Sequence, residues 1–247
     1  MALRKPNPVL SKSFGSEVET SESSTPMTME GTVNKTGFLL AILGLASASV
    51  YFGPTALVNV VASMYLGLAL ATIGIAIGVA VRPHLAKNLA VAYAVIEGLL
   101  LGTLSRILNG ELPGIGTQAL LLTFGIAAGM LFIYKAKIIE VTRNFRIAVT
   151  AATLGVAFLY LVSLLGRFLG FEVPYLHDNS AAGIAVSMAI VALAAANLAL
   201  DFDFVETGVR EAYPQRFEWV AAFGLVVTLA WLYVEVLRLL AKLRSRD

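Results

Sequence analysis

The chain has 247 residues, of which 58% are hydrophobic and 14% are charged, and its mean hydropathy is +0.81. Soluble domains are closer to about 45 to 50% apolar and about 25% charged residues, so the composition excludes an ordinary soluble domain and indicates a polytopic membrane protein. The net charge of +2 comes from few charges near segment ends and does not indicate nucleic-acid binding, and the absence of cysteine excludes disulfides and thiolate metal sites.

Residues 1–35 differ from the rest of the chain because they are polar, acidic and rich in Ser and Thr. Such a segment cannot bury enough apolar surface to offset the entropy lost on ordering. We therefore expect a disordered cytoplasmic tail. The basic start at Arg4 and Lys5 is followed by polar residues, which argues against a secretory signal peptide.

Beyond this tail, apolar runs long enough to cross a hydrocarbon core of about 30 Å recur with short breaks. The runs lack the alternation of barrel strands. The sequence predicts an all-α integral membrane protein, with a bundle of seven transmembrane helices over residues 36–241 and a basic tail at 242–247. The predicted spans are 36–52, 56–81, 85–104, 117–134, 147–168, 181–200 and 219–240.

Loop charges predict the orientation of this bundle, because positively charged short loops stay in the cytoplasm. With a cytoplasmic N-terminus, the outer loops hold only Arg106 and Arg167. The inner loops then hold Arg82, Lys87, Lys135, Lys137, Arg143, Arg146, Arg210 and Arg216. An odd number of spans places four further cations outside, against the rule: Arg238, Lys242, Arg244 and Arg246. Either the last helix is frustrated, or the last two helices do not both span.

Acidic residues inside the apolar runs are the first candidates for a functional site. Glu97 lies near the middle of the run 85–104, where a carboxylate costs about 2.5 to 3.5 kcal/mol on insertion scales. Asp201 ends the sixth run, and Asn197 shares its helical face four residues earlier. Asp203 would point about 200° away from Asp201, so only one of the two aspartates can face the core.

Partners and protonation decide what such acids can do. Glu235 and Asp203 are also compatible with interfacial charges, with Glu235 paired to Arg238 three residues later. The candidate partners of Asp201 and Glu97 are Arg82, Arg106, Arg238 and Glu235. A carboxyl group that changes between its protonated and ionised forms near neutral pH can make or break contacts between helices, and its ionised form attracts cations.

Three pairs of glycines have the spacing that lets membrane helices approach closely. They are Gly74 and Gly78, Gly98 and Gly102, and Gly125 and Gly129. The chain has 21 glycines, so chance matches are easy. The pairs predict packing inside the bundle, and a dimer face stays open as the alternative.

Several motifs together resemble one family across nearly the whole chain. They are residues 7–10, 35–37, 96–102, 200–204 and 232–240. In this order and spacing they resemble the Bax inhibitor-one family, in a bacterial branch. The resemblance implies a seven-helix fold in which the last helix is central and wrapped by the other six. It also implies a pH-sensitive calcium leak governed by two aspartates, one at the end of helix six and one in helix seven.

The resemblance transfers to this chain only in part. Asp201 corresponds to the helix-six aspartate, and Glu97 with Gly98 corresponds to the glutamate and glycine of helix three. Thr228 stands where the helix-seven aspartate is expected, and a threonine cannot share a proton as a carboxylate does. Glu235 follows two helical turns later. The ion- or pH-sensing candidates are Asp201, Glu97, Glu235, Asn197, Thr228 and Asp203, with Asp201 as a transient contact for a transported calcium ion.

Two functions remain open for a multi-pass protein of the cell membrane. One is a cation leak or pH-responsive channel with Asp201 as its gate. The other is a non-conducting regulator that docks on a membrane protein such as a protease. We do not expect an enzyme or a bound cofactor, because zinc-protease, nucleophile-elbow and phosphate-loop motifs are missing and His84 and His177 fall on opposite sides of the membrane. The oligomeric state stays open.

Overall fold

The structure is a computed structural model that describes residues 25–245 apart from 172, 175 and 177 and the side chain of residue 167. The described residues form helices, with no sheet and one isolated antiparallel bridge between Pro26 and Pro214. The helices are α2 (Met29–Tyr51), α3 (Thr55–Ser63), α4 (Tyr65–Val81), the short 3-10 helix η1 (Pro83–Leu85), α5 (Ala86–Glu111), α6 (Ile115–Lys135), α7 (Arg143–Leu169), α8 (Ala181–Arg210) and α9 (Phe217–Arg244).

Six of these helices are long and apolar enough to cross a membrane, and α3 with α4 makes a seventh span if the pair is counted as one. This confirms the predicted all-helical fold. The second predicted span is bent by 65° between α3 and α4. At the bend, Ser63 donates its hydroxyl to the carbonyl of Val60 over 2.8 Å, and the backbone N–H of Met64 is shared between Val60 and Val61. A serine that bonds back to the preceding turn bends helices, which hydropathy does not reveal.

The first helix begins earlier than predicted, at Met29. Thr28 caps it by accepting a hydrogen bond from the N–H of Gly31 over 2.9 Å. Met27 is buried, and its N–H donates to the carbonyl of Tyr213 over 2.7 Å in the turn between α8 and α9. The predicted disordered tail over 1–35 is therefore wrong for residues 25–35, because these contacts order them, and residues 1–24 lie outside the described residues.

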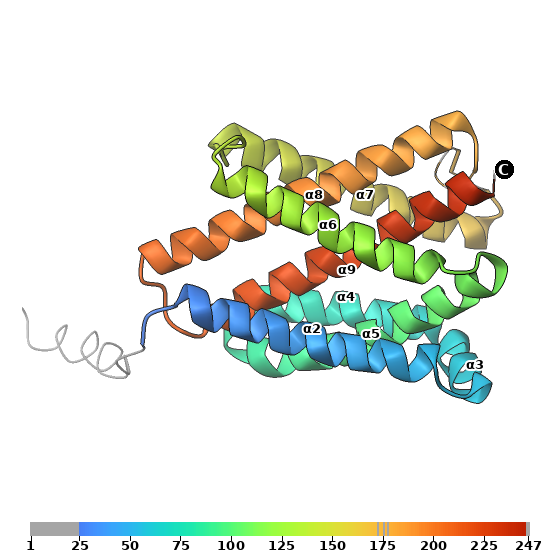
Figure 1. The fold of residues 1–247 in the computed structure, drawn as a ribbon, viewed down its shortest axis with the longest axis horizontal. Coiled ribbons are helices and arrows are strands. Elements are labelled where there is room, and N and C mark those ends of the chain that lie inside the picture. Colours follow the sequence, from blue (N-terminus) through green and yellow to red (C-terminus); the bar gives the residue numbers. More distant parts are fainter. Residues whose placement is uncertain (1–24, 172, 175, 177, 246–247) are drawn as a thin grey trace, which may run out of the picture.

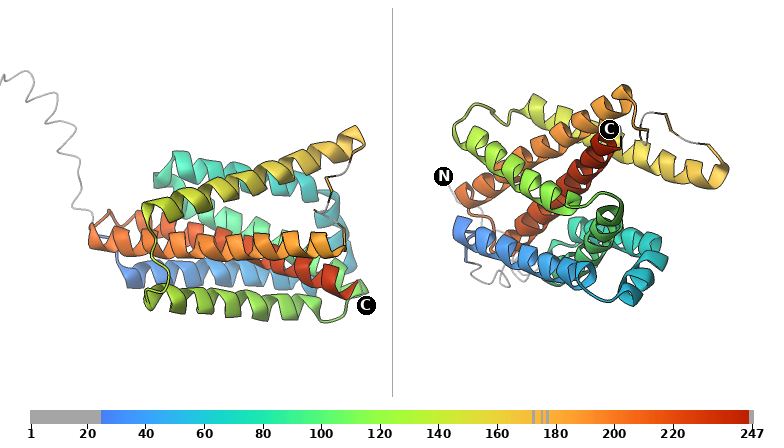
Figure 2. Two further views of the ribbon diagram at one scale, coloured as in Figure 1. Left: turned by 90° about the horizontal axis from the view of Figure 1, so that it is seen from above. Right: turned by 45° about the vertical axis from the view of Figure 1, so that its right-hand side comes forward.

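Helix α9 is the central element of the bundle, as predicted, and runs between the other helices in Figures 1 and 2. It packs most closely against α2, α5, α6 and α8, whereas α4 packs mainly on α5 and α7 mainly on α8. The other six spans therefore surround α9 in an inner and an outer layer. Its buried apolar residues are Ala221, Ala222, Phe223, Val226, Ala230, Leu232, Val236 and Leu237.

Helices α2 and α5 approach each other closely at two glycines. A Cβ atom at Gly98 would overlap the carbonyl oxygen of Leu43, and one at Gly102 would overlap that of Ser47. By contrast, a Cβ atom at Gly125 or at Gly129 on α6 would meet nothing within 4 Å. Of the glycine pairs on α5 and α6, therefore, only the pair on α5 lies in a contact between two helices of the bundle.

The two ends of the bundle hold different termini: α2 begins at one end and α9 finishes at the other (Figure 1). Lys242 was predicted to begin a basic tail, but it lies within α9 and only 4% of it is exposed. Its ammonium group donates to the carbonyls of Leu176 and Gly183, over 2.9 and 3.1 Å. These bonds explain why a lysine at this position is buried. Residues 246 and 247 lie outside the described part of the chain.

Candidate functional site

Asp201 lies on α8 and directs its carboxylate at the central helix. A Cβ atom built on Gly224 of α9 would lie 3.5 Å from Oδ1 of Asp201, and the side chain of Thr228, one turn further along α9, is within hydrogen-bonding reach of the carboxylate. The other oxygen, Oδ2, is buried and has no hydrogen-bond partner in the described part of the chain. The structure therefore brings Asp201 and Thr228 together, at the position that the family resemblance implies for the second acid.

Asn197, one turn before Asp201, holds α8 to α7. Its amide donates to the hydroxyl of Thr153 over 2.8 Å and to the carbonyl of Leu193 over 2.9 Å. The side chain is therefore bonded to α7 and to its own helix, and it is not bonded to Asp201.

Asp203 belongs to a different surface of α8. It forms an ion pair of 2.6 Å with Arg146 of α7, whose side chain is 60% exposed. Glu206, further along the same helix, accepts a hydrogen bond from Tyr134 of α6 over 2.7 Å. These two acids hold the end of α8 to its neighbours, and Asp203 does not join the interior group, as the helical spacing predicts.

Glu235 is paired with Arg238, but it is a buried residue and not an exposed interfacial one. Only 1% of its side chain is exposed, and the ion pair measures 3.1 Å. Tyr160 of α7 donates to its carboxylate over 2.7 Å, and the indole N–H of Trp231 donates over 3.1 Å. Arg238 also donates to the hydroxyl of Tyr160. This carboxylate is fully satisfied, in contrast to that of Asp201.

Glu97 lies on α5, is half-buried and faces α4. The side chain of Thr72 on α4 is within hydrogen-bonding reach of its carboxylate. No hydrogen bond or ion pair joins Glu97 to Asp201 or Glu235 among the described residues. The three candidate acids therefore occupy separate places in the bundle, on α5, α8 and α9.

The cations predicted as partners of Asp201 and Glu97 have other roles in the structure. Arg106 donates to the carbonyls of Val50 and Gly53, over 2.9 and 2.5 Å, and so satisfies the end of α2. Arg238 pairs with Glu235, and Arg82 is exposed at the end of α4. In the described residues no cation forms an ion pair with Asp201 or Glu97, so those predicted pairings are wrong.

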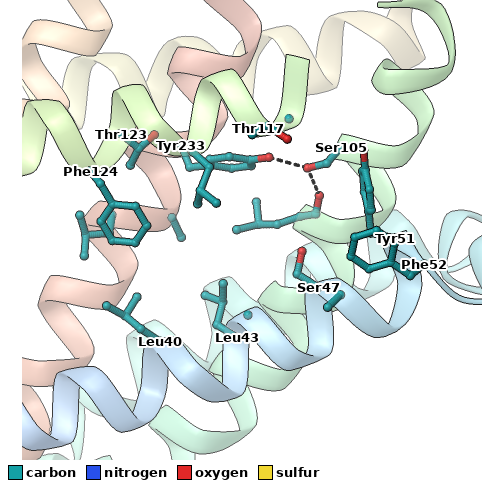
Figure 3. Close-up of a pocket in the computed structure, with 17 residues that line it drawn as sticks. Leu40, Leu43, Ser47, Tyr51, Phe52, Ser105, Thr117, Thr123, Phe124 and Tyr233 are labelled. Atoms are coloured by element: carbon teal, nitrogen blue, oxygen red, sulfur yellow. Dashed lines mark hydrogen bonds between the residues drawn. The ribbon is translucent and has the colours of Figure 1, made fainter. Parts of the chain in front are cut away.

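An apolar cavity of about 380 Å³ lies elsewhere, between α2, α5, α6 and α9 (Figure 3). Ser105 and Tyr233 share a hydrogen bond of 2.7 Å in its wall, and Ser105 also bonds to the carbonyl of Leu101. None of the candidate acids lines this cavity. No acidic residue is among those that line it, so it offers no carboxylate to a cation.

One further acid was missed by the sequence analysis. Glu218 has no exposed side-chain area; it pairs with Lys35 and accepts from the N–H and the hydroxyl of Thr28, over 2.8 and 2.9 Å. The signal was present, since an acid in the first turn of a helix is stabilised by the helix dipole. Across the described residues, no three His, Cys, Asp or Glu side chains are grouped so that they could hold a metal ion.

Comparison with known proteins gives one match. A family model described as Bax inhibitor 1 like matches residues 7–245, which is nearly the whole chain. No curated protein and no solved structure matches the chain.

Proposed function

Because the chain belongs to the Bax inhibitor 1 like family of multi-pass membrane proteins, which are generally not enzymes, we propose that it is a pH-responsive calcium leak gated by Asp201. The proposal places the N-terminus in the cytoplasm and the protein in a bacterial cell membrane. It applies the family resemblance to Asp201, whose Oδ2 is buried without a hydrogen-bond partner in the described part of the chain.

The observation that supports this proposal most is the buried, unpartnered Oδ2 of Asp201. A buried carboxylate without a donor or a counter-ion is costly, and it is relieved by a proton, a cation or water. In the protonated form, the acid is neutral and α8 stays closely packed on α9. In the ionised form, the carboxylate requires water or a cation, which would open a path beside Gly224, where the absence of a side chain leaves room. Glu235 cannot take this role while Arg238 and Tyr160 satisfy it.

Thr228 gives this member a single acid where the resemblance implies two. One carboxyl group binds one proton, so we expect calcium flux to follow a one-proton titration instead of the steeper titration of a coupled pair. Thr228 can orient the acid by hydrogen bonding, but it adds no titration of its own.

The experiment is calcium flux into proteoliposomes as a function of pH. We expect Asp201→Asn to abolish the pH dependence, because the amide cannot ionise. Asp203→Asn is the matched control, since it removes an acid from the same helix that pairs outward with Arg146, and it should keep the wild-type profile. Thr228→Asp should steepen the profile by restoring a second acid. A wild-type protein without flux at any pH, or an Asp201→Asn variant with an unchanged profile, contradicts the proposal.

The second candidate is a non-conducting regulator that docks on a membrane protein such as a protease. Gly125 and Gly129 favour it, because both are exposed on α6 and face open space, which would admit the backbone of a partner helix. A bilayer-embedded partner crosslinked through α6, together with the absence of flux, would support this function over the leak.

A further inference from the structure

A second pocket, of about 610 Å³, opens where α2, α5 and α9 begin, and Asp201 is not among the residues that line it. We call it the headgroup pocket. It is lined by Asn34, Lys35 and Phe38 of α2, Lys87, Asn88 and Val91 of α5, and Trp219 of α9. We propose that it binds the phosphodiester group of an anionic phospholipid, with Lys87 as the main contact.

The two lysines of the headgroup pocket lie around one aromatic ring. The ammonium group of Lys35 lies 5.5 Å from the ring centroid of Trp219, and that of Lys87 lies 6.0 Å from it. Phe38 packs edge-on against the same ring, with centroids 6.3 Å apart. Cation–π contacts of this kind hold ammonium groups in place without neutralising them. The pocket therefore presents positive charge beside a fixed apolar wall.

The charge balance of the pocket matches a singly charged anion. Lys35 is compensated by Glu218, with which it forms an ion pair. Lys87 forms no ion pair with an acidic residue in the described part of the chain. The pocket thus keeps one uncompensated positive charge, with the amides of Asn34 and Asn88 as neutral donors beside it. A phosphodiester carries one negative charge and several acceptor oxygens, which complements this set.

The position of the pocket favours a lipid over a free anion. It lies near the beginning of three apolar helices, within the first three turns of α2 and the first two turns of α5 and α9, and Trp is favoured at the level of the lipid headgroups. Basic pockets between transmembrane helices bind anionic headgroups. Phe38, Val91 and Trp219 offer an apolar wall that a free phosphate would not use, whereas the upper part of an acyl chain would cover it.

Fluorescence of Trp219 provides a direct test, because the chain has only two tryptophans. In a Trp231→Phe background, the full chain in neutral detergent is titrated with short-chain phosphatidylglycerol, with short-chain phosphatidylcholine, and with glycerol 3-phosphate, all at one ionic strength. We expect a saturable response to phosphatidylglycerol alone. Lys87→Gln should weaken it about fivefold, from the contribution of one lysine near an anionic surface.

Lys135→Gln is the matched control, because Lys135 is an exposed lysine of another helix end on the same side of the bundle. It should leave the phosphatidylglycerol response unchanged. If the Trp231→Phe background does not fold, lipid retained by the wild type and by Lys87→Gln is counted by native mass spectrometry instead. An equal response to phosphatidylcholine, an equal response to glycerol 3-phosphate, or an equal loss in both lysine variants would overturn the proposal.

Discussion

Replacing Gly98 by alanine should weaken the packing of α5 on α2. The new Cβ atom would overlap the carbonyl oxygen of Leu43 and lie 2.8 Å from the Cβ atom of Ala46. The first of these neighbours is backbone, so no side-chain rotation can relieve the contact and α2 has to move. Overpacking of this kind costs about 1 to 3 kcal/mol.

The matched control is Gly125→Ala on α6, where a Cβ atom meets nothing within 4 Å. Alanine is favoured over glycine within a helix by about 1 kcal/mol, and both variants gain this increase in helix propensity. The difference between them therefore isolates the steric cost. We expect Gly98→Ala to be about 1 to 3 kcal/mol less stable than Gly125→Ala.

The assay is the free energy of unfolding in mixed micelles, from titration with a denaturing detergent. The double variant Gly98→Ala with Gly102→Ala should cost less than the sum of the single variants, because one displacement of α2 relieves both contacts. Equal stability of Gly98→Ala and Gly125→Ala would refute the reasoning, since it would mean that the backbones of α2 and α5 are not in contact at this glycine.

Two further predictions concern buried charges away from Asp201. Lys242→Met should lower the free energy of unfolding by about 1 to 3 kcal/mol, because the carbonyls of Leu176 and Gly183 lose their donor. Lys135→Met, at an exposed position, should leave the free energy of unfolding unchanged. An equal loss of stability in the two variants would contradict the assigned role of Lys242. Glu218→Ala should destabilise the start of α2 more than Glu218→Gln, because glutamine keeps an acceptor for Thr28 and loses only the charge that pairs with Lys35. Amide exchange in the first turn of α2 measures this difference, and identical exchange in both variants would show that Thr28 does not depend on residue 218.

The spans could be predicted from hydropathy, whereas their ends could not. The sixth run was predicted to end at residue 200, but α8 continues to Arg210. Hydropathy falls at Asp201 because charged residues begin there. The helix nevertheless continues, since Asp203 and Glu206 find partners on α7 and α6. Such partners come from distant parts of the chain, so a window of neighbouring residues does not contain the information.

In the candidate site, too, the contacts that depend on distant parts of the chain could not be predicted from the sequence. The approach of Thr228 to Asp201 was expected only from the family resemblance, which aligns Thr228 with the helix-seven aspartate; spacing along a single helix does not fix the register between α8 and α9. The burial of Glu235 could not be predicted, because Tyr160, which bonds to it, lies 75 residues away. The sequence also could not show which glycine pair lies in a contact between helices. The same spacing on α5 and α6 gives a tight contact at Gly98 and open space at Gly125.

The cations near the C-terminus can be reconciled with a last helix that spans the membrane. Helix α9 has 28 residues and is long enough to cross. The described cations at its finishing end are all bonded to the protein: Arg106, Lys242 and Arg244 to backbone carbonyls, and Arg238 to Glu235.

The opposite end of the bundle, where α2 begins, keeps cations that form no ion pair in the described part of the chain. They are Arg82, Lys87, Lys135, Lys137, Arg143 and Arg216. The rule that positive loops stay in the cytoplasm counts Lys and Arg in the short loops beside the spans, and these cations gather at this end. The described cations near the C-terminus, in contrast, are bonded within the fold. The free cations instead favour a cytoplasmic N-terminus, which would place the headgroup pocket at the leaflet surface where anionic lipids attract basic residues.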